Sequence, residues 1–222
     1  MINIKDPSEV IVVGVDVGGK KKGFHAVALR GGTYWQKYQG ANSAASLAEW
    51  CVGIKASAVG VDAPCGWSKT GRARAAEREL MAEGIWCFST PTLEAARAHP
   101  KDYFRWMILG AELFDFLSAK YRLFDDQKRL NELVCFETFP HAVTCAMQGK
   151  KTSAKRKRVE RRELLRLAGV DTAELTNIDL VDAALCALTA HALLADNYKT
   201  YGDVTEGFIV VPAKPLLTDI AR

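Results

Sequence analysis

Three short apolar runs in this chain each carry one acidic residue near the carboxyl end, and this pattern constrains the fold more than any other feature. The runs are VIVVGVDV at 10–17, with Asp16, ASAVGVD at 56–62, with Asp62, and LVCFETF at 133–139, with Glu137. Continuous apolar runs of this length are typical of central strands covered on both faces. Because open sheets place their active sites at the carboxyl edge of the strands, we expect the three acids to mark a functional edge.

The segments between these runs predict an α/β fold. Residues 24–29 and 33–38 read as two strands joined by Gly31-Gly32, a two-residue link that favours a tight antiparallel hairpin. Ser43 is a suitable N-cap for a helix over 44–52. The alanine- and leucine-rich segment 178–195 predicts a helix buried against the sheet.

Residues 66–131 are predicted to form a helical insertion after the fourth strand, because charged and apolar residues mix there at helical spacing. We find no internal repeat and no low-complexity linker, so one domain over 1–222 is expected, with 207–211 as a short closing strand or tail extension.

Composition and segment lengths favour a soluble cytoplasmic protein. Hydrophobic residues make up 49% and charged residues 25% of the chain, which is ordinary for a globular protein. The longest nearly apolar stretch, 183–195, is shorter than the roughly 20 residues that cross a bilayer. Neither the six cysteines nor the four histidines have zinc-ligand spacing, and among the histidines only His141 lies near the expected active edge.

The late helix adds two more acids, Asp179 and Asp182, three residues apart and therefore on one helical face. Asp179 also completes a Thr176-x-x-Asp capping pattern, which is a structural alternative for it. Burying several carboxylates together is costly unless a cation neutralises them, so the pattern predicts a divalent metal site for Mg²⁺ or Mn²⁺. The predicted metal ligands are Asp16, Asp62, Asp179 and Asp182, and the predicted catalytic residues are Asp16, Asp62, Glu137 and Asp182.

A basic segment points to a polyanionic partner. Residues 149–168 hold nine Lys and Arg against two Glu, so this segment carries +7 whereas the whole chain carries only +4. Such a segment favours contact with nucleic acid phosphates, although a solvated helix face gives the same pattern. DNA and RNA stay equally open, and Trp67, Trp86 and Phe139 are candidate stacking surfaces. The predicted nucleic-acid contacts are Lys20, Lys22, Lys155, Arg156, Arg158 and Arg162.

The order of these motifs resembles the ribonuclease H-like superfamily: GVDVGGKKKG at 14–23, the glycine-linked hairpin, VDAP at 61–64 and DLVDAALCAL at 179–188. The paired aspartates of the late helix resemble those of Holliday-junction resolvases. VDAPCGW at 61–67 and FETFPH at 136–141 are similar to domain-of-unknown-function family 429, whose members are regarded as predicted nucleases.

The resemblance implies a mixed five-stranded sheet flanked by helices, with the helical insertion after the fourth strand. It also implies roles for the acids. Asp16 matches the first-strand metal ligand, Asp62 the fourth-strand acid, and Asp182, with Asp179, the acid of the final helix. Glu137 matches the glutamate of the fifth strand in family 429. The chain departs from resolvases at Asp62, because their fourth-strand acid is typically a longer glutamate.

Three functions are compatible with these features. The leading hypothesis is a metal-dependent nuclease that hydrolyses phosphodiesters. A non-catalytic module that binds nucleic acid or metal is the first alternative. A phosphotransferase of the sugar-kinase type is the second, because a first strand followed by DVGG and a hairpin also cradles phosphates, but such enzymes repeat the fold in two lobes. A homodimer is compatible with the resolvase resemblance, since two-fold symmetry suits symmetric junctions.

Overall fold

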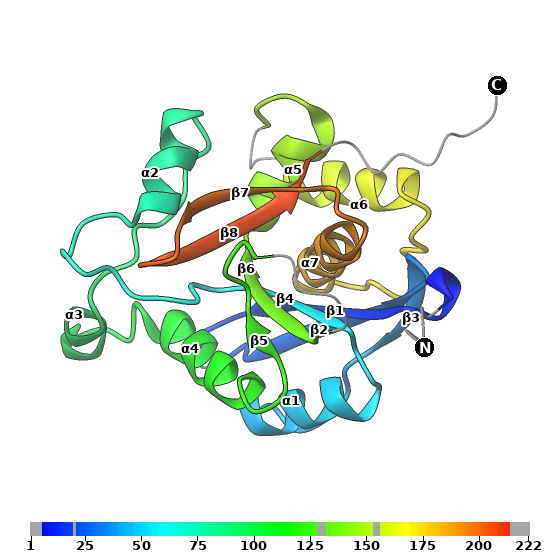
Figure 1. Cartoon of the computed structure of the whole chain (residues 1–222), viewed down its shortest axis with the longest axis horizontal. Helices are drawn as coiled ribbons and strands as arrows, with labels where there is room; N and C mark the ends of the chain where they lie inside the picture. Colours follow the sequence, from blue (N-terminus) through cyan, green and yellow to red (C-terminus); the bar gives the residue numbers. More distant parts are fainter. Residues whose placement is uncertain (1–5, 20, 128–131, 153–155, 214–222) are drawn as a thin grey trace.

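The computed structural model describes residues 6–19, 21–127, 132–152 and 156–213, which form a mixed α/β fold (Figure 1). The strands are β1 (Ile11–Val17), β2 (Phe24–Arg30), β3 (Thr33–Lys37), β4 (Ala58–Asp62), β5 (Arg122–Leu123), β6 (Val134–Thr138), β7 (Tyr198–Asp203) and β8 (Gly207–Pro212). The helices are a 3-10 turn η1 (Pro7–Glu9), α1 (Ala44–Gly53), α2 (Ala75–Ala82), α3 (Leu93–Ala98), α4 (Arg105–Leu117), α5 (Pro140–Gln148), α6 (Lys157–Leu167) and α7 (Ile178–Leu194).

All strands join one mixed sheet in the order β3-β2-β1-β4-β6-β8-β7, with β5 paired to the first half of β6. β1, β4, β6 and β8 are parallel, whereas β2, β3 and β7 are antiparallel to their neighbours. The sheet therefore has eight strands and not the five expected. β5 is only two residues long, and β7 is an edge strand of polar sequence, YKTYGD, so neither has the apolar pattern from which strands are recognised.

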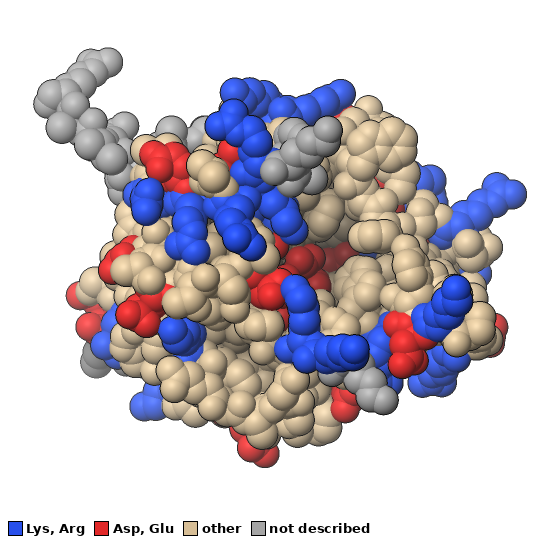
Figure 2. All heavy atoms as spheres, turned by 180° about the vertical axis from the view of Figure 1, so that it is seen from behind, with Lys and Arg blue, Asp and Glu red and all other residues tan. Residues whose placement is uncertain are grey.

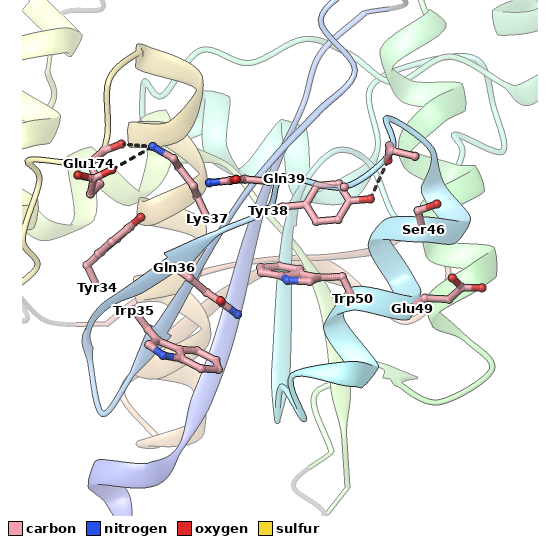
Figure 3. Close-up of a pocket in the computed structure, with 12 residues that line it drawn as sticks. Tyr34, Trp35, Gln36, Lys37, Tyr38, Gln39, Ser46, Glu49, Trp50 and Glu174 are labelled. Carbon is pink, nitrogen blue, oxygen red and sulfur yellow. Dashed lines mark hydrogen bonds and ion pairs between the residues drawn. The ribbon is translucent and has the colours of Figure 1, made fainter.

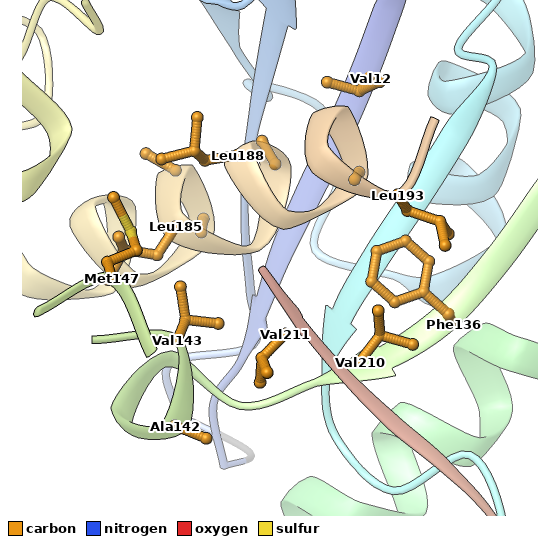
Figure 4. Close-up of a cluster of buried hydrophobic side chains, with 14 of the residues drawn as sticks. Val12, Phe136, Ala142, Val143, Met147, Leu185, Leu188, Leu193, Val210 and Val211 are labelled. Carbon is orange, nitrogen blue, oxygen red and sulfur yellow. The ribbon is translucent and has the colours of Figure 1, made fainter. Parts of the chain in front are cut away.

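Helices cover both faces of the sheet, with α5, α6 and α7 on one face and α1 and α4 on the other (Figure 1). Side chains alternate along β1: Val12 packs in the core beneath α7, whereas Val13 and Val15 pack beneath α1 and α4. At Gly14 a Cβ would lie 2.0 Å from the Ala183 carbonyl oxygen, so glycine is what lets α7 rest directly on β1. Figure 4 shows Leu185 and Leu188 of α7 in this core.

The glycine hairpin and the first helix are as predicted. Gly31 and Gly32 have φ of 53° and 83°, which is the left-handed conformation that a tight two-residue hairpin turn requires. Ser43 caps α1, because its side chain accepts a hydrogen bond of 3.2 Å from the Ser46 backbone N–H. The glycine turn therefore sets β2 beside β3, and the Ser43 cap sets where α1 begins.

The cap of α7 differs from the predicted one. Asn177 is the N-cap, and its side-chain oxygen accepts from the Leu180 backbone N–H at 2.8 Å, so the Thr176-x-x-Asp pattern does not form the cap. Asparagine is as good a cap as threonine and lies one residue nearer to the helix. The carboxylate of Asp179 is consequently left for another partner.

The insertion contains α2, α3 and α4, with irregular segments between them and β5 after them. α3 ends at Ala98, two residues before Pro100, which cannot continue a helix. None of the described helices is long and apolar enough to cross a membrane.

Candidate functional site

Asp16 and Asp62 lie side by side at the carboxyl edge of the sheet. β1 and β4 are parallel neighbours, and their register pairs Asp16 with Asp62 directly. Side chains alternate along a strand, so Asp16 lies on the same face of the sheet as Val12, which packs beneath α7. Asp62 lies on the same face as Gly60, where a Cβ would be 2.7 Å from the Cys186 carbonyl oxygen of α7. Both carboxylates therefore point toward the helix that carries the other two predicted ligands.

Electrostatic effects show that three aspartates form one cluster. Burial, reinforced by the carboxylates of Asp182 and Asp179, raises the pKa of Asp16 to about 7. Burial and the charges of Asp16 and Asp182 raise the pKa of Asp62 well above its usual range. Burial also raises the pKa of Asp182, against the opposing effect of Arg161. We call Asp16, Asp62 and Asp182 the acidic cluster; burial raises the pKa of all three carboxyls, so their protonated forms are favoured.

Two acids of α7 already contact cations. Arg161 of α6, itself buried, donates from Nη1 to Oδ1 of Asp182. Lys22 donates from Nζ to both carboxylate oxygens of Asp179, at 2.8 and 3.0 Å. Within the described part of the chain, no three His, Cys, Asp or Glu side chains converge closely enough to hold one metal ion. The acidic cluster is therefore a set of neighbouring carboxylates and not a closed ligand shell.

Glu137 is not a member of the acidic cluster: it lines the same small cavity as Asp62, but its position in β6 places its side chain on the opposite face of the sheet. In the register of β4 and β6 it pairs with Val61, which packs beneath α1 and α4. Its carboxylate accepts two hydrogen bonds from the Arg74 guanidinium, at 2.6 and 2.8 Å, and one from the Cys65 backbone N–H at 2.9 Å. Arg74 also donates from Nε to Glu77 at 2.8 Å. Glu137 thus ties the loop after Asp62 to β6.

The predicted nucleic-acid contacts are distributed unevenly. Arg156 and Arg158 are exposed at the start of α6, whereas Arg162 donates to the backbone carbonyls of Thr172 and Leu175 and braces the loop before α7. Lys20 and Lys155 lie outside the described residues.

Charge is arranged around a hollow on the face turned away in Figure 1. Figure 2 shows acidic side chains recessed in this hollow, with Lys and Arg side chains on its rim.

Arg161 and His25 are site residues that the sequence analysis did not identify. Arg161 shares one face of α6 with the buried Leu164 and Leu165, because residues three or four positions apart lie on the same side of a helix. This spacing was the sequence signal that Arg161 faces inward. His25 is paired with Asp16 in the register of β1 and β2, and its buried Nδ1 has no hydrogen-bond partner among the described residues. Burial lowers the pKa of His141, and the charges of Arg161 and Lys157 lower it further.

A second hollow, of about 900 Å³, lies along the edge strand β3 and α1. In Figure 3 the ring of Tyr38 lies over Trp50, at a centroid distance of 5.3 Å, while Lys37 points to Glu174. The charged lining is one lysine and two glutamates, Glu49 and Glu174. Because this lining is net negative, it is a poor site for phosphate, and we place no part of a nucleic acid there.

Comparisons with known proteins assign the chain to a family. A model of the family described as "Protein of unknown function (DUF429)" matches residues 14–206, which include all members of the acidic cluster. Searches of curated proteins and of solved structures found no match. The matched region covers most of the 222 residues, and the chain therefore belongs to the DUF429 family.

Proposed function

We propose that this protein is a divalent-metal-dependent nuclease that hydrolyses phosphodiesters at the acidic cluster. The observation that carries the proposal is the convergence of Asp16, Asp62 and Asp182 at one sheet edge, with the pKa of each raised by burial and, for Asp16 and Asp62, by the other carboxylates. The exposed Arg156 and Arg158 add a surface for phosphates. The order of a first strand, a hairpin, a parallel fourth strand and a late helix supports the ribonuclease H-like resemblance.

The donor set suits Mg²⁺ or Mn²⁺. These ions prefer carboxylate oxygens, and a divalent charge would stabilise the ionised forms of Asp16 and Asp62, whose pKa burial and the neighbouring carboxylates raise. Asp16 and Asp62 are the first candidates to hold an ion, because neither carboxylate has a cation within ion-pair distance among the described residues. Asp182 would become a third ligand if its ion pair with Arg161 opened. When bound, the ions supply an activated water and stabilise the leaving oxygen.

The protein groups around the cluster would orient the substrate. Arg161 is held at Asp182, and its buried Nε has no partner among the described residues, so the guanidinium keeps an unused donor beside the cluster. Lys22 is mostly exposed and reaches the cluster from the loop after β1. Burial of the carboxylates limits access of bulk water, which strengthens each of these electrostatic contacts.

A non-catalytic binding module is a second candidate, and one observation favours it. Asp182 and Asp179 each have a cation partner already, and the described residues form no closed metal shell. In that case the ion pairs would hold α6 and α7 together and the acids would serve the fold. The two candidates differ in whether nucleic acid is cut.

The deciding experiment is cleavage of a panel of labelled single-stranded, duplex and junction substrates, in DNA and in RNA, with Mg²⁺ or Mn²⁺. We expect at least one substrate to be cut, and we expect a chelator to stop the reaction. A folded protein that binds substrate and metal but cuts none of the panel would contradict the nuclease and favour the binding module.

Removing two exposed charges from α6 should weaken nucleic-acid binding. For Arg156→Gln with Arg158→Gln, we expect the slope of log affinity against log salt to become shallower by about 1 for each phosphate that the variant no longer neutralises. The matched control is Lys55→Gln with Lys120→Gln, since these exposed lysines lie at the amino edge of the parallel strands. An unchanged slope in the α6 variant, measured by fluorescence anisotropy, would remove both arginines from the interface.

A further inference from the structure

The insertion carries exposed aromatic rings that pack against one another. Phe88 and Tyr103 are 64% and 53% exposed, which is unusual for large aromatic side chains. The ring centroid of Phe88 lies 6.3 Å from those of Tyr103 and Trp106, and Tyr103 lies 4.9 Å from Phe104. The rings of Phe88 and Tyr103 meet at 77°, so they do not stack face to face on each other. We call Phe88, Tyr103, Phe104 and Trp106 the aromatic surface.

The aromatic surface borders the acidic cluster. Phe88 and Trp106 line a small cavity of about 50 Å³ together with Asp62, and Phe139 lines the same cavity. The surface is thus adjacent to the proposed cleavage site on the β4 side. Arg97 and Lys101, both exposed, lie between Phe88 and Tyr103 in sequence and offer donors for a phosphate backbone, beside the exposed Glu94 and Asp102.

A buried hydrogen-bond network fixes the loop that presents Phe88. The backbone N–H of Thr90 donates to Glu77 at 3.0 Å, and Glu77 is bound by Arg74, which in turn binds Glu137 of β6. The next residue in the loop, Pro91, accepts from the Ser68 backbone N–H at 3.1 Å. Phe88 therefore loses little conformational freedom when it binds a ligand, as expected of a preorganised contact.

We propose that the aromatic surface stacks an unpaired nucleotide base next to the scissile phosphate, so that the substrate is a nucleic acid with unpaired bases at the cleavage site. This inference rests on the proposed function and extends it to the substrate class. Bases within a duplex offer only their edges in the grooves, whereas an unpaired base offers a flat face to an aromatic ring. Continuity with Asp62 through one cavity favours substrate over a second copy of the chain as the occupant.

The test measures binding separately from cleavage. In an Asp16→Asn background with Mg²⁺, we compare a short single-stranded oligonucleotide, its abasic analogue and the matching duplex by fluorescence anisotropy. Phe88→Ala should weaken binding of the single strand roughly tenfold and leave binding of the abasic strand and the duplex unchanged. The control is Phe116→Ala, which removes a 47% exposed ring of α4 that lies outside the aromatic surface and should change none of the three affinities.

Each outcome has a definite meaning. Equal losses for the normal and abasic strands, or no loss for either, would overturn base stacking at Phe88. A parent protein that dimerises in sedimentation velocity, with the dimer absent in Phe88→Ala and oligonucleotide affinity unchanged, would assign the surface to a second copy. Base-dependent binding through Phe88 without any cleavage by the parent would refute the nuclease and keep the stacking surface. Cleavage of duplex and single strand alike, unaffected by Phe88→Ala, would support the nuclease and overturn the stacking surface.

Discussion

Asp16→Asn is expected to abolish metal-dependent cleavage and, at the same time, to make the protein more stable. The amide keeps the shape of the side chain but loses the charge that would bind the metal. Removing one electrostatic stabiliser from an active site lowers rates by on the order of 10²–10³-fold, and removing a metal ligand should cost at least as much. The matched control is Asp115→Asn, an exposed acid on α4 outside the acidic cluster, which should leave cleavage unchanged.

The gain in stability has a defined pH dependence. Burial and the neighbouring carboxylates raise the pKa of Asp16 from 3.8 to about 7, so the folded state disfavours the ionised form. Below about pH 4 the carboxyl is protonated in both folded and unfolded chains and costs nothing. Between about pH 4 and 7 the unfolded chain ionises first, so the stability of the parent falls as pH rises. Above about pH 7 we expect Asp16→Asn to be more stable by on the order of 1–3 kcal/mol.

Thermal unfolding at several pH values, with and without Mg²⁺, measures this effect. Metal should stabilise the parent above about pH 7, because an ion that binds only the folded state shifts the unfolding equilibrium, and it should stabilise Asp16→Asn less. If the variant cuts nucleic acid like the parent, Asp16 is not a metal ligand. If it is less stable than the parent at about pH 8, burial and the neighbouring carboxylates do not destabilise the ionised Asp16 in the folded protein.

Much of the fold is predictable because its local patterns are strong. The buried strands β1, β4 and β6 are continuous apolar runs, and the hairpin between β2 and β3 is encoded by Gly31-Gly32, so their positions follow from the sequence within about two residues. β7 is different: it is a polar edge strand, and its pairing with β8 depends on neighbours and not on its own residues.

The site is also predictable only in part, because some of its contacts depend on residues that are distant in the sequence. The convergence of Asp16, Asp62 and Asp182 follows from strand ends and a buried helix. The partners of the acids do not, because they come from distant parts of the chain. Arg74 reaches Glu137 across 63 residues, and Arg161 reaches Asp182 across 21. A run of basic residues indicates nucleic acid in general, but it does not say which of its arginines faces inward.

Arg74→Met should cause the largest loss of stability among the variants considered. Arg74, Glu77 and Glu137 are 1%, 1% and 4% exposed, and Arg74 contacts both carboxylates at 2.6 to 2.8 Å. Removing one partner of a buried ion pair leaves an uncompensated buried charge and typically costs about 3–5 kcal/mol. Here two carboxylates lose their shared cation, so we expect the upper part of that range in urea unfolding.

Two further variants separate the buried network from ordinary ion pairing. Arg122→Met removes an arginine that is 21% exposed and pairs with Asp125 and Glu132, and it should cost less than Arg74→Met because solvent partly screens these pairs. Glu137→Gln keeps the shape of the side chain and leaves Arg74 paired with Glu77, so it should cost about 1–3 kcal/mol and remain folded if Arg74→Met does not.

The network also links stability to the site. Glu137 accepts from the Cys65 N–H and Glu77 accepts from the Thr90 N–H, so the network fixes both the loop after Asp62 and the loop that presents Phe88. In Glu137→Gln we therefore expect weaker cleavage than in the parent but a smaller loss than in Asp16→Asn, since Glu137 acts through the position of Asp62. Equal stability of Arg74→Met and Arg122→Met would show that the buried charges are not what holds these loops in place.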